Sequence, residues 1–389
     1  MNNSILHKEI QNFIRSYSLP LSKLAFAGSP FSKVTVQELM QQIESRVKIK
    51  SKLPTWYKNH QIYYPPKLNL EQTSSELTAK YKASLISGSS LADISGGFGV
   101  DSYYFSNSIN RVDSFEINGD LSEIAKHNFN ILKKSNIHCY QKDGLEQVLQ
   151  QPYQFIYADP SRRNDTKGKV YLLEDCKPNI PKNIDKLLNQ CSILMLKTSP
   201  MLDISAGLSE LKRVSQIHIV AINNEVKELI WLLEKDSDAQ PHIYTVNLKK
   251  SSSETFNFKW KTSAENTISD PLRYLYEPNA AILKAGAFSL LTEKFKVEKL
   301  HKHTHLYTSK TKRDFPGRRF VIEQVIPYSK KEIRKNIGGK NANITIRNFP
   351  ESVASLRKKW KIDEGGSSYL FFTTIANDKK VVIVCSKAR

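Results

Sequence analysis

Residues 93–101, Asp-Ile-Ser-Gly-Gly-Phe-Gly-Val-Asp, decide the fold of this chain. They follow a short apolar run and precede a segment of helical character, so the glycines fall at a strand-to-helix turn. Glycine at such a turn lets a ligand approach the backbone and leaves the first helix amides exposed to it. The stretch does not supply the Gly-x-Gly-x-x-Gly spacing of a dinucleotide-binding fingerprint. It therefore predicts that another cofactor lies against Gly96, Gly97 and Gly99.

Segments of strand and helix character alternate on both sides of this turn, between residues 71 and 249. Strands are expected at 90–95, 111–117, 137–141, 154–159, 192–197, 217–222 and 242–249. Helices are expected between them, the last at 225–235. This alternation predicts an α/β fold with a parallel, doubly wound, Rossmann-like sheet.

Acidic residues follow successive strands of this domain. The turn, read as acid-x-Ser-Gly-Gly-x-Gly from Asp93, resembles motif I of class I S-adenosylmethionine-dependent methyltransferases, with Ser95 in place of the first glycine. Glu116 ends the second strand, where an acid can accept hydrogen bonds from both ribose hydroxyls. Asp143 follows the third strand, where this fold commonly places an acid beside the adenine amine. We expect the turn, Asp93, Ser95, Glu116 and Asp143 to bind S-adenosyl-L-methionine.

The fourth strand ends in Asp159-Pro160-Ser-Arg162-Arg163, which bears on the methyl acceptor. It resembles the (Asp/Asn)-Pro-Pro-aromatic motif of enzymes that methylate exocyclic amines, but has Ser and Arg in the last two places. There the acid orients an amine towards the activated methyl group, and positioning does most of the work. Asp159 and Pro160 are therefore the expected catalytic residues. Arg162 and Arg163 either hold substrate phosphate or are exposed loop charges.

Other reactive side chains do not form a recognisable site. Uracil-C5 methyltransferases carry a similar Asp-Pro-Pro-Arg motif but need a cysteine after the fifth strand, whereas this strand ends in Lys197-Thr-Ser-Pro and Cys191 lies at its start. His301, His303 and His305 alternate and could face one way, but an exposed basic strand is expected rather than a metal site.

Composition places the chain among cytoplasmic globular proteins. Its 389 residues are 40% hydrophobic, enough for a large core, and no run approaches the ~18 apolar residues of a membrane span. The first residues lack the apolar segment of an export signal. The cysteines at positions 139, 176, 191 and 385 form no CxxC pair.

Positive charge gathers outside the predicted catalytic domain. The net charge of +20 comprises +6 over residues 1–75, zero over 76–250, +3 over 251–310 and +11 over 311–389. Basic flanks on a neutral core predict a polyanionic partner such as RNA, although a solubility role stays open. Near the amino end, Thr35 and Glu38 predict a helix capping box, and Trp56 and Tyr57 lie among lysines, where they either contact RNA or pack on the next domain.

The chain from about residue 50 onward is similar to a bacterial family of class I methyltransferases with a C-terminal THUMP-like domain. The matching stretches include SGGFGVDS, ADPSRR, KVYLLEDCKPN, LYEPNAAILKAG and FPGRRFVIEQVIPYSKKEIR. The resemblance implies the fold and cofactor, and an RNA substrate by analogy with other THUMP domains. It predicts an N-terminal helical region (1–70), a methyltransferase domain (71–249), a small α+β connecting domain (250–312) and a THUMP-like domain (313–389).

Three functions follow from these observations. The first is methylation of a base, with an exocyclic amine favoured, in structured RNA such as tRNA or rRNA. The second is methylation of a protein or small molecule. The third is RNA binding by a chain whose Rossmann-like core is inactive, against which the presence of both Glu116 and Asp159 argues.

Overall fold

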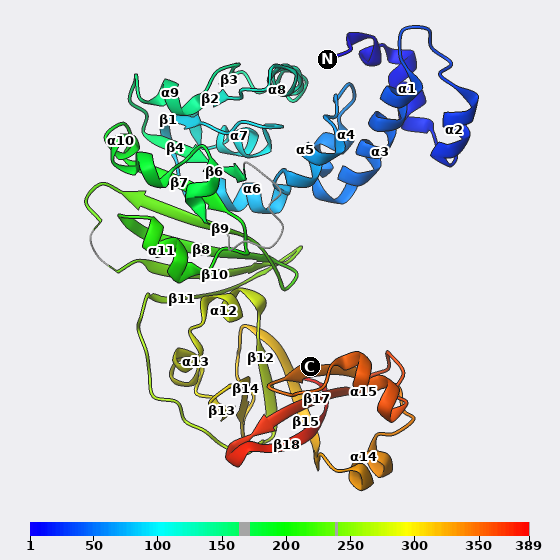
Figure 1. Ribbon diagram of the computed structural model, residues 1–389, viewed down its shortest axis with the longest axis vertical. Helices are drawn as coiled ribbons and strands as arrows, with labels where there is room; N and C mark the ends of the chain where they lie inside the picture. The colour runs from blue at the N-terminus through cyan, green and yellow to red at the C-terminus, as the bar shows by residue number, and fades with distance from the viewer. Residues whose placement is uncertain (163–171, 238–239, 389) are drawn as a thin grey trace. The chain divides into compact units, whose positions relative to one another are not determined.

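The computed structural model describes residues 1–162, 172–237 and 240–388 (Figure 1). They form two compact units. The first comprises Met1–Ile217 and Leu229–Ala239, and the second comprises His218–Glu228 and Gln240–Arg389. None of the helices within these ranges combines the length and apolar character needed to cross a bilayer.

The amino-terminal part of the first unit is helical, as expected. Its helices are α1 (Lys8–Ser16), α2 (Leu21–Ala27), α3 (Val36–Lys52), α4 (Pro54–Lys58) and α5 (Lys67–Gln72). The predicted capping box begins α3: Glu38 N donates to Thr35 Oγ1 at 3.2 Å, and Thr35 N donates to the Glu38 carboxylate at 2.8 Å. Trp56 is fully buried, with its ring 4.7 Å from that of Tyr103. Packing on Tyr103 of the following domain, rather than RNA contact, therefore explains this tryptophan.

A parallel sheet forms the centre of the first unit. Its strands are β1 (Gly88–Asp93), β2 (Ile109–Phe115), β3 (Ile137–Tyr140), β4 (Phe155–Ala158) and β7 (Ile193–Thr198), in the order β7-β4-β1-β2-β3. The intervening helices are α6 (Glu76–Ala83), α7 (Val100–Phe105), α8 (Gly119–Ile131), α9 (Gly144–Val148), α10 (Ile184–Leu188) and α11 (Ile204–Glu210). Because the strands are parallel, their carboxyl ends meet at one edge of the sheet, where α/β proteins bind ligands.

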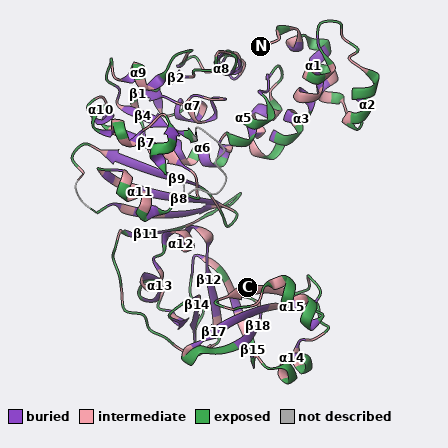
Figure 2. Cartoon of the chain, viewed as in Figure 1, coloured by how far each residue is buried: buried purple, intermediate pink, exposed green. Residues whose placement is uncertain are grey.

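The helix expected at 225–235 is wrong. Residues Glu225–Glu234 form strand β9, which pairs antiparallel with β7. The preceding strand, β8 (Val214–Ile222), neighbours β9 in the sheet, and both Asn223 and Asn224 between them have positive φ. Figure 2 shows β9 as a buried strand, and six consecutive residues from Glu228 onward are buried. A strand buried on both faces has no alternation of apolar and polar residues, so it is easily taken for a helix.

The second unit contains the strand pair β10 (His242–Leu248) and β11 (Ser253–Lys259) and a seven-stranded sheet in the order β13-β14-β12-β15-β18-β17-β16. The strands of this sheet are β12 (Tyr274–Pro278), β13 (Glu298–His301), β14 (Thr304–Ser309), β15 (Gly317–Pro327), β16 (Asn343–Arg347), β17 (Tyr369–Ile375) and β18 (Lys379–Lys387). Its helices are α12 (Ala280–Ala285), α13 (Phe288–Phe295), α14 (Lys330–Asn336) and α15 (Val353–Trp360). Because β12 pairs with β15, residues on both sides of position 312 share one sheet.

Candidate active site

The glycine turn joins β1 to α7, and each of its glycines has its own reason to be glycine. A Cβ at Gly96 would lie 2.5 Å from Ser114 Oγ, and one at Gly99 would lie 2.3 Å from the Phe129 ring. Gly97 and Gly99 also have positive φ, at 56° and 83°. A Cβ at Gly97, in contrast, would meet only a backbone oxygen, at 3.6 Å. The turn thus packs tightly on β2 and α8 and presents Gly97 to open space.

Asp93 holds this turn from inside the protein. Its side chain is buried, and it accepts hydrogen bonds from Ser95 N at 3.0 Å, Ser95 Oγ at 3.2 Å and Ser102 Oγ at 2.6 Å. Burial raises the pKa of Asp93 to about 7. The structure therefore gives this predicted cofactor ligand a positioning role. Ser95 Oγ also accepts a hydrogen bond from Asp159 N at 2.7 Å and so links the turn to the fourth-strand motif.

Glu116 follows β2 and faces the turn. One carboxylate oxygen accepts a hydrogen bond from Gly97 N at 2.9 Å, and the other accepts one from Asn118 N at 2.8 Å. The carboxylate is thereby fixed beside the open face of Gly97, and each oxygen keeps a second lone pair. The next residue, Ile117, has 69% of its surface exposed. Sequence reasoning missed Ile117, although an apolar residue directly after a site carboxylate was the available signal.

Asp143 lies after β3 and is exposed. Its Oδ1 atom accepts hydrogen bonds from Leu145 N at 2.9 Å and Glu146 N at 3.4 Å, so it caps α9. A Cβ at Gly144 would lie 2.6 Å from the Ile94 Cα, which shows how closely the start of α9 packs on the glycine turn. Asp143 thus belongs to the same edge of the sheet as Glu116.

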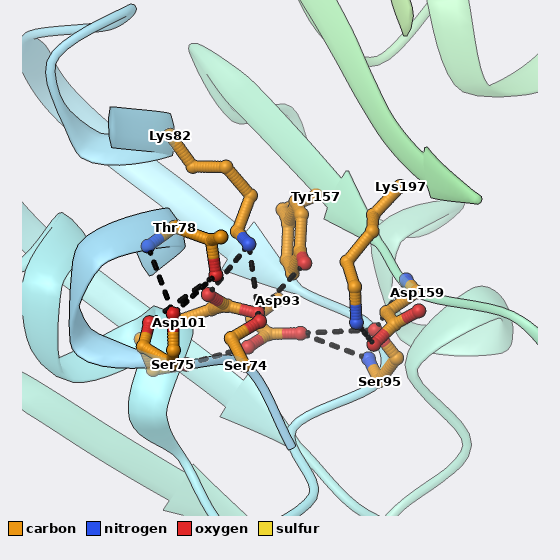
Figure 3. Close-up of polar contacts among 11 residues, drawn as sticks. Ser74, Ser75, Thr78, Lys82, Asp93, Ser95, Asp101, Tyr157, Asp159 and Lys197 are labelled. Carbon is orange, nitrogen blue, oxygen red and sulfur yellow. Dashed lines mark hydrogen bonds and ion pairs between the residues drawn. The ribbon is translucent and has the colours of Figure 1, made fainter. Parts of the chain in front are cut away.

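Asp159 ends β4 and forms an ion pair with Lys197, the penultimate residue of β7 (Figure 3). The two strands are parallel neighbours, with Ala158 opposite Leu196, which brings both side chains to the carboxyl edge. The bond from Lys197 uses Asp159 Oδ2, and Oδ1 has no hydrogen-bond partner within the described ranges. The Lys197 side chain is 12% exposed and that of Asp159 is 34% exposed. Pro160 is buried.

A second buried pair lies behind the turn (Figure 3). The fully buried Lys82 places its ammonium 3.1 Å from Asp101 Oδ1, and the hydroxyls of Ser74 and Tyr157 each donate to Asp101 Oδ2 at 2.8 Å. Burial by itself would raise the pKa of Asp101, but Lys82 and Lys197 hold it below its ordinary value. The segment from Ser74 to Lys82 is therefore part of the site, and sequence reasoning missed it.

The other predicted groups lie elsewhere or outside the description. Arg162 belongs to the short strand β5 (Ser161–Arg162), which pairs with β6 (Cys176–Lys177), and Arg163 lies outside the described residues. Burial raises the pKa of Cys139 and Cys191 to about 12, which makes both poor nucleophiles. The described ranges contain no group of three His, Cys, Asp or Glu side chains able to hold a metal ion.

The prediction of one exposed strand that contains the three histidines is wrong. His301 ends β13, His305 lies in β14, and His303 occupies the turn between them. His301 is buried with its Nε2 3.0 Å from Asp378, while the His305 ring stacks on Phe288 with a centroid separation of 3.5 Å. The rings of His301 and His303 lie 5.6 Å apart, whereas that of His305 packs against Phe288.

Comparison with known proteins identifies the family. A ferredoxin-like domain model matches residues 274–316, and a THUMP domain-like model matches residues 317–387. The crystal structure of a putative methyltransferase from Porphyromonas gingivalis W83 shares 30% sequence identity over 100% of both chains, with a TM-score of 0.89. A search of curated proteins gave no match.

Two further solved structures match a smaller part. An rRNA methylase from Streptococcus thermophilus is 14% identical over 41% of this chain and 94% of its own, with a TM-score of 0.30. A putative methyltransferase from Streptococcus mutans in complex with SAH is 13% identical over 41% of this chain and 96% of its own, also with a TM-score of 0.30.

The fold and the edge of the sheet define a Rossmann-like methyltransferase core, preceded by helices and followed by an α+β module. The full-length match then assigns the chain more narrowly. It belongs to the family of class I methyltransferases with a C-terminal THUMP-like domain.

Proposed function

We propose that this protein uses S-adenosyl-L-methionine to methylate an exocyclic amine of a base in structured RNA. The observation that carries the proposal is the placement of Glu116 and Asp159. These carboxylates end two strands of one sheet, and Ser95 and Gly97 of the glycine turn connect them by hydrogen bonds. One acid is thus available to the cofactor and the other to the acceptor.

The residues of the turn fit the cofactor. The open face of Gly97 lets the methionine and ribose parts approach the backbone, and Glu116 can accept from two ribose hydroxyls with its remaining lone pairs. Exposed Ile117 offers an apolar surface for the adenine ring, and the Asp143 carboxylate can accept a hydrogen bond from the adenine amine. When bound, the cofactor supplies a methyl group already activated by a sulfonium.

The protein's own contribution is to orient the acceptor. Asp159 Oδ1 accepts a hydrogen bond from the acceptor amine and turns its lone pair towards the methyl group. Lys197 holds Oδ2 and Ser95 holds the backbone amide, so the carboxylate cannot rotate away.

The charge distribution and the THUMP-like module support RNA as the substrate. Residues 311–389 carry 18 basic and 7 acidic side chains, against equal numbers over the catalytic residues 76–250. A polyanion is the natural ligand of such a module.

The proposal is tested in two steps. Calorimetry of the purified protein should show binding of S-adenosylmethionine and of its demethylated product. Tritium transfer from labelled cofactor to bulk rRNA and tRNA, taken from a strain that lacks the gene, should then be followed by mass spectrometry of nucleosides. Methylated exocyclic amines are expected. If the protein binds the cofactor but transfers the methyl group only to protein, the RNA substrate is wrong. If the wild-type protein binds no cofactor, the proposed methyltransferase activity is wrong.

A further inference from the structure

A buried carboxylate in the second unit holds two arginines. The Glu277 side chain is 2% exposed. Arg318 Nε donates to one of its oxygens at 2.5 Å, and Arg347 Nη2 lies 2.6 Å from the other. The arginine side chains are themselves 41% and 34% exposed. A carboxylate inside the protein thus fixes two guanidinium groups that reach the surface.

The seven-stranded sheet brings these residues together by curling. Glu277 on β12 is directly opposite Arg318 on β15, but Arg347 ends β16, which is separated from β15 by two strands in the sheet order. Thr345, two residues before Arg347, accepts a hydrogen bond from Arg318 Nη2 at 3.2 Å. The edge strand therefore folds back to meet β12 and β15. The contact between Arg347 and Glu277 joins strands that are not neighbours in the sheet, so it could not be expected from the sequence.

The cluster carries more positive than negative charge. Two guanidinium groups against one carboxylate leave one positive charge uncompensated. Three buried atoms here have no hydrogen-bond partner within the described ranges: the donor Arg347 Nε, His305 Nδ1, and the acceptor Glu277 Oε1, whose contact with Arg347 is an ion pair. Burial, with Lys299 and Arg347 nearby, lowers the pKa of His305 to about 4, so this ring is neutral near pH 7 and adds no charge to the cluster. The exposed parts of both arginines carry this excess positive charge, which favours an anion here.

We infer that Arg318 and Arg347 form a binding site for a backbone phosphate of the RNA substrate. Guanidinium groups match the geometry of phosphate oxygens with paired N–H donors. Glu277 and Thr345 pre-organise both groups, so little side-chain freedom is lost when a phosphate binds. The inference rests on the proposed function for its choice of RNA, since the surrounding residues 311–389 carry a net charge of +11.

Arg319 provides a matched control. It is the next residue on β15, its side chain is 39% exposed, and it pairs with the exposed Asp314 at 3.0 Å. Replacing Arg318 or Arg319 by glutamine removes the same charge from the same strand. A purely electrostatic contribution of the module would therefore respond equally to both changes.

The experiment measures binding of a fluorescently labelled RNA hairpin to the full chain by anisotropy over a range of salt. R318Q should weaken binding about 10-fold, equivalent to about 1.4 kcal/mol, and should lower the slope of log K against log salt by roughly 0.7–0.9. R319Q should change affinity less than about threefold. Equal losses for R318Q and R319Q would overturn the site.

A second pair of variants keeps the buried carboxylate partnered. R318K and R347K leave Glu277 beside a cation, so the melting temperature should stay near that of wild type, while loss of the paired donors should still weaken RNA binding at least about threefold relative to R319K. Lysine variants with full RNA affinity would contradict the inference. Displacement of the hairpin by polyglutamate with the same dependence on Arg318 would overturn RNA in favour of an acidic peptide.

These outcomes are separable from those of the proposed function. Calorimetric affinity for S-adenosylmethionine should be unchanged in every variant, because the substitutions lie outside the first unit. A wild-type chain that binds RNA but shows no Arg318 dependence overturns only the phosphate site. A wild-type chain that binds no RNA overturns the proposed substrate as well.

Discussion

Replacement of Asp159 tests the proposed chemistry most directly. Asp159→Ala removes the carboxylate at the end of β4 and leaves Glu116, Gly97 and the rest of the turn in place. A misplacement of ~1 Å at the reacting centre costs on the order of 100-fold in rate, so the methyl-transfer rate should fall by at least about 100-fold. Affinity for S-adenosylmethionine should stay within about threefold.

The structure also limits how far this substitution can disturb folding. Lys197 loses its partner at Asp159 but stays close enough to Asp101 to lower the pKa of that acid, so the ammonium is not left without an anion. The Asp159 side chain is one-third exposed, and loss of such a pair costs about 1 kcal/mol. A fall in activity of 100-fold at an almost unchanged melting temperature would therefore report on catalysis.

Asp159→Asn separates orientation from charge. Its amide oxygen can still accept a hydrogen bond from the acceptor amine, so activity should exceed that of Asp159→Ala by at least about 10-fold. The assay is single-turnover transfer of a tritiated methyl group to RNA from a strain lacking the gene. Asp185→Ala, which breaks an exposed ion pair with Arg213, serves as the control. Near-normal turnover by Asp159→Ala would refute the exocyclic-amine mechanism and favour a carbon or ribose-oxygen target.

Three further predictions follow. Glu116→Ala should weaken S-adenosylmethionine binding at least ~10-fold in calorimetry, because hydrogen bonds to a charged group contribute roughly 1.5–3 kcal/mol; equal affinities would remove this acid from the cofactor site. RNA affinity of the full chain should fall steeply with salt, with a slope of roughly −0.7 to −0.9 per phosphate contact, and a salt-independent interaction would favour the solubility role of the basic residues. Burial raises the pKa of Asp93 from 3.8 to about 7, so between these pH values the folded state binds one proton more than the unfolded state. The stability that Asp93 contributes is therefore present below about pH 4 and is lost as pH rises through 7. Asp93→Asn should remove up to about 4 kcal/mol of this pH dependence from urea unfolding curves, and identical pH profiles would contradict the shift.

The sequence predicts the parallel core well because each of its strands is followed by its own helix. The error at 225–235 has a physical cause. Leu229 to Leu233 are all buried, so both faces of the strand are apolar and the run also fits a helical period. The clearer signal was Asn223-Asn224 between two apolar runs, since adjacent residues with positive φ are typical of a hairpin turn.

The histidine stretch fails for a related reason. Alternation of His301, His303 and His305 indicates one strand, but Lys302-His303 forms a tight connection between two strands. One continuous strand and two strands joined by a turn differ in the contacts that the histidines make with distant segments of the chain. Asp378 binds His301, and Phe288 stacks on His305. A periodic pattern carries no information about such contacts.

The same distinction explains which site residues could be predicted. The shared position of Glu116, Asp143 and Asp159 at one edge of the sheet was predictable, because parallel strands bring their carboxyl ends together and position along the chain then implies proximity. The burial of Lys82 and Lys197 was not predictable. Lysine is ordinarily exposed, and its burial depends on a carboxylate contributed by another element. Lys197 pairs across 38 residues of sequence with Asp159, and Lys82 pairs with Asp101.

Lys82 and Lys197 help to explain how several acidic side chains can lie close to the glycine turn. Asp93, Asp101 and Asp159 gather within the first unit, and carboxylates this close together repel one another unless cations or hydrogen-bond donors face them. Lys82 and Lys197 supply one cation for each of Asp101 and Asp159, while Asp93, which pairs with hydroxyl and amide donors only, is the acid whose pKa rises. Two of the three acids therefore face a cation, and the third is held by neutral donors alone.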